Sequence, residues 1–172
     1  KFYGNTENQA AFGLLWSNDG LYAAFDVEDD FVINSGAEYC WDDDSVELFL
    51  DLDLKSGSYG AATPNVTQLT FRYNDDTVYV CGSPYNAETN LINASLIRHK
   101  SARSEKGYTV EIFVPWAAFG RDDIMAGKVL GVTAQMNDKD VDDAAAYEDS
   151  ALAYTVSETS NGSNSKGWPQ FV

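Results

Sequence analysis

Apolar and polar residues alternate strictly along much of the chain, and this two-residue period is typical of β-strands. The segments that follow it are 13–17, 21–27, 45–51, 68–73, 77–82, 94–99, 108–114, 129–136 and 151–156. Turn-forming residues separate them, as in SNDG at 17–20 and SEKG at 104–107. One short helical turn is expected at 115–120, between Pro and Gly. Without long helices, the pattern predicts an all-β fold, an antiparallel β-sandwich of the jelly-roll kind.

The same alternation assigns side chains to faces. In 45–51 (SVELFLD), the apolar residues at even positions share one face and are predicted core. Glu47, Arg72 and Gln135 then lie on the exposed, non-core face of three different strands. Planar groups with several donors or acceptors suit the recognition of adjacent sugar hydroxyls. An ordinary polar, solvent-facing side is the alternative.

Composition narrows the function classes. The chain has 27 Asp and Glu against 11 Lys and Arg, a formal net charge of −16, so nucleic acids and anionic membrane surfaces are not expected partners. No apolar run is long enough for membrane insertion. The 4 Trp, 10 Tyr and 9 Phe serve either a large core or the stacking of sugar rings.

Cysteine and histidine offer little reactive chemistry. Cys40 and Cys81 favour one disulfide in a secreted protein, and two buried free thiols are the alternative. His99 is the sole histidine, which argues against a zinc site with several His ligands and against a catalytic triad.

Five segments, in order, resemble carbohydrate-binding modules of family 9, which are sugar-binding β-sandwiches appended to xylanases and related plant-polysaccharide enzymes. They are 14–30, 41–51, 68–74, 107–119 and 129–140. The distinctive combination is W-x-x-D-S-V-E-x-F-x-D, then F-R, then Y-T-V-E-I-x-x-P-W, and finally Q-x-N-D. The resemblance covers nearly the whole chain, and it implies that the chain lacks the family's opening segment, which ordinarily supplies an early strand.

The resemblance implies a slot in which aromatic rings sandwich a terminal sugar ring. Trp41 matches the first stacking residue, and the three polar residues named above match those that hydrogen-bond the hydroxyls. Trp168 matches either the second stacking residue or an aromatic that begins the last core strand, and Asn161 lies near a ligand-binding Asn. The implied ligand-binding residues are therefore Trp41, Glu47, Arg72, Gln135, Asn161 and Trp168.

Calcium is also implied by the resemblance, because ions of this kind fix loops around the sandwich. Asp29 and Asp44 match acidic positions near such a site, and Asp51 is a further candidate ligand. Ca²⁺ takes six to eight oxygen ligands, and clustered carboxylates repel one another without it. A solvated acidic turn is the alternative.

We therefore expect residues 1–172 to form a single secreted, non-catalytic domain, complete or lacking its first strand. It is expected to bind β-glucan or xylan chains or their ends, and to travel with catalytic or scaffold domains. The alternatives are a structural or interaction module that has lost its sugar slot, a glycosidase, which needs two carboxylates flanking a bond, and a haem domain, which needs axial Met or His ligands.

Overall fold

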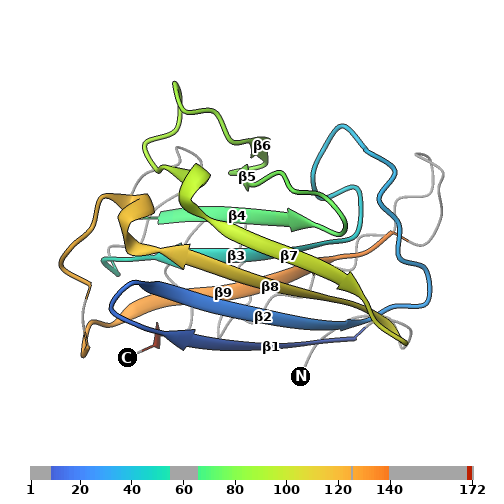
Figure 1. Ribbon diagram of the computed structural model, residues 1–172, viewed down its shortest axis with the longest axis horizontal. Coiled ribbons are helices and arrows are strands. Elements are labelled where there is room, and N and C mark those ends of the chain that lie inside the picture. The colour runs from blue at the N-terminus through green and yellow to red at the C-terminus, as the bar shows by residue number, and fades with distance from the viewer. Residues whose placement is uncertain (1–8, 55–65, 125, 140–169, 172) are drawn as a thin grey trace.

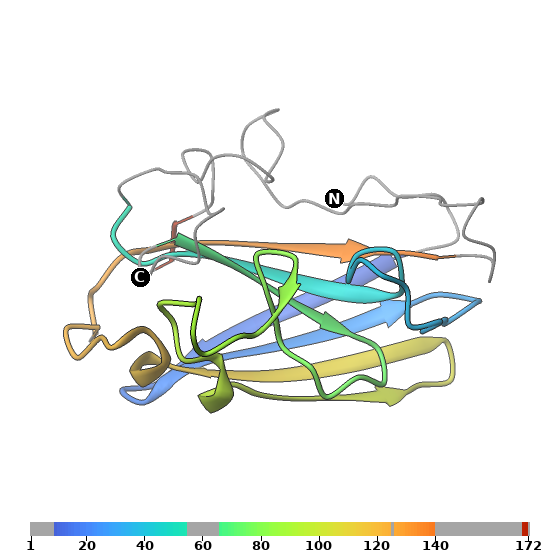
Figure 2. The same ribbon diagram turned by 90° about the horizontal axis from the view of Figure 1, so that it is seen from above.

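The computed structural model describes residues 9–54, 66–124, 126–139 and 170–171, and it consists of two antiparallel β-sheets packed face to face (Figure 1). Sheet A has the order β1 (Gln9–Trp16), β2 (Gly20–Glu28), β8 (Gly107–Pro115), β7 (Arg98–Arg103). Sheet B has the order β10 (Gln170–Phe171), β9 (Leu130–Asn137), β3 (Ser45–Asp51), β4 (Val66–Arg72), β5 (Tyr79–Val80), β6 (Ser83–Pro84). Figure 2 shows the two sheets as separate layers. The predicted antiparallel β-sandwich is confirmed.

Several predicted strands have different bounds, and β1 begins four residues before the predicted segment 13–17. The segment 94–99 begins as a 3-10 turn, η1 (Ala94–Leu96), and strand β7 starts only at Arg98. The segment 77–82 contains only the short β5, because Cys81 and Gly82 both adopt positive φ (50° and 84°) and turn the chain back into β6. The segment 151–156 lies outside the described residues.

The helical turn after β8 is confirmed as η2 (Trp116–Phe119), which ends at Gly120 with φ of 62°. Trp116 is buried and donates its indole N–H to the carbonyl of Ser17 (3.0 Å). Among the described residues, no helix is long and apolar enough to cross a membrane.

The core lies between the sheets and follows the predicted phase. The apolar residues at even positions of β3 are fully buried there, and those of β4 and β9 with the predicted phase join them. Burial of this apolar surface is the main favourable term in folding.

The opposite side of sheet B, its outer face, differs from the prediction of an exposed face. Glu47 is 1% exposed, Thr70 0% and Arg72 4%, so these residues are non-core but buried. A buried polar group must be hydrogen-bonded to avoid a large free-energy cost. The contacts of this face therefore decide what it can do.

The expected disulfide is not present: Cys40 and Cys81 are both free thiols. Cys40 is buried with its Sγ 3.7 Å from the carbonyl oxygen of Gly82. Burial raises the pKa of the Cys40 thiol to about 11, so it stays protonated at neutral pH. His99, the sole histidine, lies with Nε2 2.8 Å from the carbonyl oxygen of Asp75.

Candidate functional site

Three neighbouring strands bring the predicted polar residues onto the outer face of sheet B. The register pairs Glu47 of β3 with Thr70 of β4 on one side and with Gln135 of β9 on the other. Arg72 lies two residues after Thr70, opposite Ser45. Side chains at such positions share one face of a sheet. We call Glu47, Thr70, Arg72 and Gln135 the polar row.

The carboxylate of Glu47 is the centre of this row. Its Oε1 accepts hydrogen bonds from the Thr70 hydroxyl and the Asn137 amide (3.1 Å each), and its Oε2 accepts one from the Gln68 amide (2.9 Å). Gln135, which is half-buried, donates to Asn137 (3.0 Å). Gln68 and Asn137 share the phase of Glu47, so the alternation contained the signal that would have identified them.

Arg72 holds the loop that carries Trp41. One terminal nitrogen donates to the carbonyls of Ala37 (2.5 Å) and Tyr39 (2.9 Å), and the other lies 3.5 Å from Asp43. Its guanidinium lies 5.0 Å from the centre of the Tyr79 ring. The Nε of Arg72 is buried and has no hydrogen-bond partner in the described structure. Arg72 therefore orients the loop through its two terminal nitrogens.

Asp43 completes the loop anchor. Burial alone would raise the pKa of this carboxyl, but hydrogen bonds from Ser35, from the backbone N–H of Ala37 and from Lys139 outweigh burial and lower the pKa. Asp43 is therefore ionised at neutral pH and paired with both Arg72 and Lys139. Through Asp43 the loop is fixed to Arg72 at the end of β4 and to Lys139, two residues after the end of β9.

Trp41 packs within its own loop. Its ring is stacked on Tyr39, with centroids 5.1 Å apart and planes at 7°. A Cβ at Gly82 would lie 2.5 Å from Cζ3 of the indole, so only glycine allows the ring to lie there. Trp41 is half-buried, whereas Tyr39 is 48% exposed. The sequence interpretation missed Tyr39, although an aromatic two residues before Trp41 was visible.

A buried acidic cluster lies at the same end of the sandwich. Asp29, Asp44 and Asp138 offer carboxylate oxygens that all lie within 4.8 Å of one another. They come from the ends of β2 and β9 and the start of β3. Asp29 and Asp44 were predicted together, and Asp138, the last residue of the Q-x-N-D motif, was missed. Asp51 lies at the opposite end of β3, about 20 Å along the strand, and is not part of this cluster.

The electrostatics of the cluster favour a cation. Burial, together with the charges of Asp29 and Asp138, raises the pKa of Asp44 to about 8, although the backbone N–H groups of Ile33 and Lys139 donate to it. Burial first, and then the same carboxylates, raise the pKa of the Tyr108 hydroxyl, which has no hydrogen-bond partner in the described structure. Carboxylate oxygens are hard donors of the kind that Ca²⁺ takes, and these three would be part of its ligand set.

Two predicted ligand-binding residues, Asn161 and Trp168, lie outside the described residues. The described site therefore contains one indole, the polar row, the Tyr39 ring and the acidic cluster. The polar row and the loop that Arg72 anchors are within reach of each other, because Arg72 belongs to both.

The chain resembles known proteins in its sequence and in its fold. The family model described as "Carbohydrate family 9 binding domain-like" matches residues 3–168. Endo-1,4-beta-xylanase A of Thermotoga neapolitana is 28% identical over 127 residues, which is 73% of this chain but 10% of that enzyme.

Two solved structures share the fold. Both are of a carbohydrate binding module family 9 from Caldicellulosiruptor kristjanssonii, one in complex with cellotriose and one with glucose. The cellotriose complex has a TM-score of 0.76, and the match covers 98% of this chain and 76% of that one. The glucose complex has a TM-score of 0.74, with 98% and 78% covered. Each is 20% identical to this chain.

Proposed function

The chain belongs to the carbohydrate family 9 binding domain-like family, a family of carbohydrate-binding modules, and from this premise we propose that it binds β-glucan or xylan chains, or their ends, without cleaving them. Cellotriose and glucose are bound by relatives with the same fold, and the xylanase relative acts on a β-1,4-linked chain. The residues that we assign to the ligand are those of the polar row together with Trp41.

The observation that carries this proposal is the unpaired Nε of Arg72. It is a buried donor on the same face of sheet B as Glu47, and an unsatisfied buried donor costs about 1–3 kcal/mol unless a ligand or water accepts from it. Sugar hydroxyls both accept hydrogen bonds, as Arg72 Nε requires, and donate them, as the Glu47 carboxylate requires. Gln135, the half-buried member of the row, supplies an amide for a neighbouring hydroxyl.

Trp41 supplies the apolar contact. We assign the sugar ring to the part of the indole that Tyr39 and Gly82 leave uncovered, where its C–H groups meet the π-face. Asn161 and Trp168 remain proposed members of the same slot. With one described stacking ring, an affinity between about 1 μM and 1 mM is expected.

A catalytic role is not proposed. Glycosidases need two carboxylates on either side of the scissile bond. Among the described members of the polar row, Glu47 is the only carboxylate, and three side-chain donors already hold it. It is therefore suited to accept hydrogen bonds from a ligand rather than to transfer protons.

We assign the acidic cluster to a structural calcium ion, with Asp29, Asp44 and Asp138 as its carboxylate ligands. The ion supplies the positive charge that offsets their repulsion. Because these residues join the ends of β2 and β9 to the start of β3, calcium stiffens the loop that carries Tyr39 and Trp41.

The wider setting is also a proposal. The match spans only a tenth of the xylanase, so we propose that the module is secreted as part of a longer chain with a catalytic or scaffold domain. That domain's substrate is then the polysaccharide that the module binds.

A structural or interaction module is the second candidate, because Tyr39 already stacks on Trp41 and the members of the row at Glu47 and Arg72 are nearly inaccessible. Titration calorimetry in calcium buffer with cellotriose and xylotriose separates the two. Sugar binding requires heat with the wild type, loss of at least about tenfold in affinity with Trp41→Ala, and no change with Trp16→Ala. Trp16 is a matched control, since it is 44% exposed and pairs with the start of β2, whereas the loop that carries Trp41 follows the other end of that strand. No heat from the folded wild type with either sugar would favour the structural module.

A further inference from the structure

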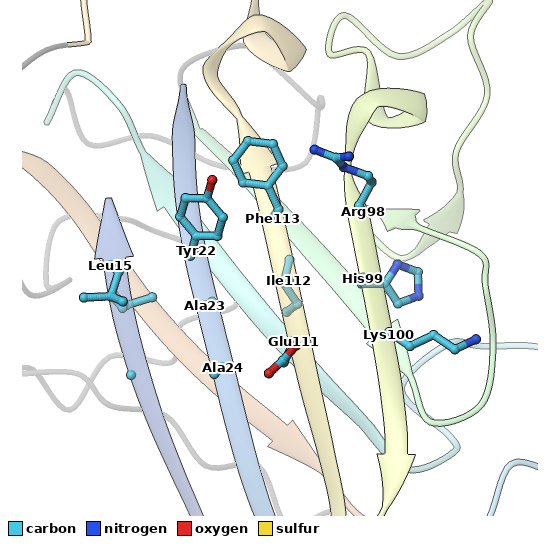
Figure 3. A pocket seen from close by; sticks show the side chains of 12 residues that line it. Leu15, Tyr22, Ala23, Ala24, Arg98, His99, Lys100, Glu111, Ile112 and Phe113 are labelled. Carbon is cyan, nitrogen blue, oxygen red and sulfur yellow. The ribbon is translucent and has the colours of Figure 1, made fainter. Parts of the chain in front are cut away.

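A groove of ≈ 710 Å³ lies over the outer face of sheet A, on the side of the sandwich away from the polar row (Figure 3). Residues in register on all four strands form its two rows. The first row is Leu15, Tyr22, Phe113 and Arg98, and the second is Gly13, Ala24, Glu111 and Lys100. The groove therefore crosses the strands, and its volume is that of an ordinary ligand site.

Small residues hollow the second row. A Cβ at Gly13 would meet nothing within 4 Å, and Ala24 offers only a methyl group. The larger side chains of the first row stand beside them, as Figure 3 shows for Leu15, Tyr22 and Phe113. The depression is thus formed by small residues of the strands and not by a loop.

The first row contains two aromatic rings and is exposed to solvent. The rings of Tyr22 and Phe113 lie 4.6 Å apart, with planes at 31°. Tyr22 is 44% exposed and Leu15 is 75% exposed. The outer face of an antiparallel sheet is normally polar, and a contiguous exposed apolar surface marks a contact with a partner.

Positive charge gathers at one side of this row. The chain has a net charge of −16, yet the six residues of β7 include Arg98, Lys100 and Arg103. The guanidinium of Arg98 lies 5.1 Å from the centre of the Phe113 ring. Lys100 lies 3.4 Å from Asp76, but both groups are highly exposed, so this ion pair exchanges readily. Among the described residues, Glu111 is the single acidic one that lines the groove.

We propose that this groove is a second glycan-binding surface, which takes an extended polysaccharide chain that carries uronate groups. Pyranose C–H faces stack on Tyr22 and Phe113, Glu111 accepts from hydroxyls, and Arg98 and Lys100 bind the uronate carboxylate. Four strands spaced about 4.8 Å apart give a row about 14 Å long, which is long enough for a short stretch of a polysaccharide chain. The surface goes beyond the function proposed above and shares no residue with the polar row.

The test uses two xylo-oligosaccharides of equal length, one neutral and one with a single glucuronic acid branch. Calorimetry is run on the wild type and on Trp41→Ala, Tyr22→Ala, Arg98→Ala and Arg103→Ala, each checked for its fold by circular dichroism. Arg103→Ala is the matched control, because it removes the same charge from the same strand without touching the groove.

The Trp41→Ala protein is expected to bind the acidic oligosaccharide, and to bind the neutral one at least several-fold more weakly. Tyr22→Ala and Arg98→Ala are expected to lose about tenfold or more in affinity for the acidic sugar, whereas Arg103→Ala keeps it. Higher salt is expected to weaken the binding, because Arg98 and Lys100 are exposed.

Loss of all binding to the acidic sugar in Trp41→Ala would overturn this proposal while leaving the function of the polar row intact. Equal affinity of Trp41→Ala for the two sugars would overturn it as well. So would full binding of the acidic sugar by a folded Tyr22→Ala protein. A wild type that binds the acidic sugar at Tyr22 but gives no heat with cellotriose would support it and contradict the function proposed for the polar row. Self-association that Tyr22→Ala abolishes, with no glycan bound, would assign the groove to a second copy of the chain instead.

Discussion

The outer faces of the two sheets have opposite characters. On sheet B, Glu47 and Arg72 are charged and yet nearly inaccessible, and each makes several hydrogen bonds. On sheet A, Tyr22 and Leu15 are apolar and yet exposed. A buried charged group is tolerated when hydrogen-bond partners are fixed around it. A contiguous exposed apolar surface, in contrast, marks a contact with a ligand or partner. Burial and hydrogen bonding, more than residue type, distinguish a preorganised site from a contact surface.

The largest expected effect compares one residue type on the two faces. Glu47→Ala leaves the donors of Gln68, Thr70 and Asn137 without their acceptor, so we expect it to lower the free energy of unfolding by about 3–5 kcal/mol. Glu111→Ala removes an exposed carboxylate from sheet A and is expected to change it by less than about 0.5 kcal/mol. Urea unfolding measures both, and equal losses would show that Glu47 is not held as described.

Calcium removal is expected to come next. At a calcium concentration of about 100 times Kd, the ion adds about 2.7 kcal/mol to the stability. We expect Asp138→Asn to abolish the rise in Tm on adding calcium, and Asp51→Asn, at the far end of β3, to retain it. Differential scanning calorimetry with calcium and with a chelator measures this, and the reverse result would restore the ligand set expected from sequence.

The calcium effect should also depend on pH. The folded-state pKa of Asp44 is raised to about 8, so its contribution to the stability of the metal-free protein is present below its ordinary pKa and is lost as pH rises to about 8. The gain in Tm on adding calcium should therefore be larger at about pH 8 than at about pH 5. A gain that is the same at both pH values would contradict the described environment of Asp44.

A smaller effect concerns the placement of Trp41. Gly82→Ala and Gly127→Ala both put a side chain at positive φ (84° and 87°), but only the first meets another residue, the indole of Trp41. We expect Gly82→Ala to cost about 1–3 kcal/mol more than Gly127→Ala in chemical unfolding, since it also overpacks the loop. Only Gly82→Ala should change the tryptophan fluorescence and weaken cellotriose binding. Identical behaviour of the two variants would place the Trp41 ring elsewhere.

The smallest expected change in stability is on sheet A. Tyr22→Ala removes a half-exposed ring that contacts Phe113, so we expect a loss of about 0.5–1.5 kcal/mol. Urea unfolding measures it, with Leu91→Ala, an exposed loop residue, as the control. A loss as large as that of Glu47→Ala would mean that the ring belongs to the core.

The strict alternation in residues 45–51 and 129–136 was enough to predict strands β3 and β9 and their core phase, because one face of each strand packs against sheet A. It could not show that the other face is buried, since burial there depends on what lies over the sheet. Nor could it show that Asp138 lies beside Asp44, because that depends on how far each carboxylate lies along paired strands.

The loop between β2 and β3 was the least predictable part of the site. Trp41 was identified by resemblance, but its contact with Tyr39 and the anchoring of its loop by Arg72 depend on how the loop folds against β4. No local period encodes such contacts. The disulfide expected for Cys40 failed for the same reason, since its thiol lies in a buried setting next to Thr70 and Gly82.

The most direct test of the central claim is a ¹H–¹⁵N correlation spectrum, recorded while cellotriose is titrated into the calcium-loaded protein. The side-chain Nε–H of Arg72 and the indole N–H of Trp41 are expected to shift together with one affinity, while the indole N–H groups of Trp16 and Trp116 stay in place. Binding that moves the Trp16 signal and leaves Arg72 and Trp41 unchanged would contradict the assignment of the sugar to the polar row.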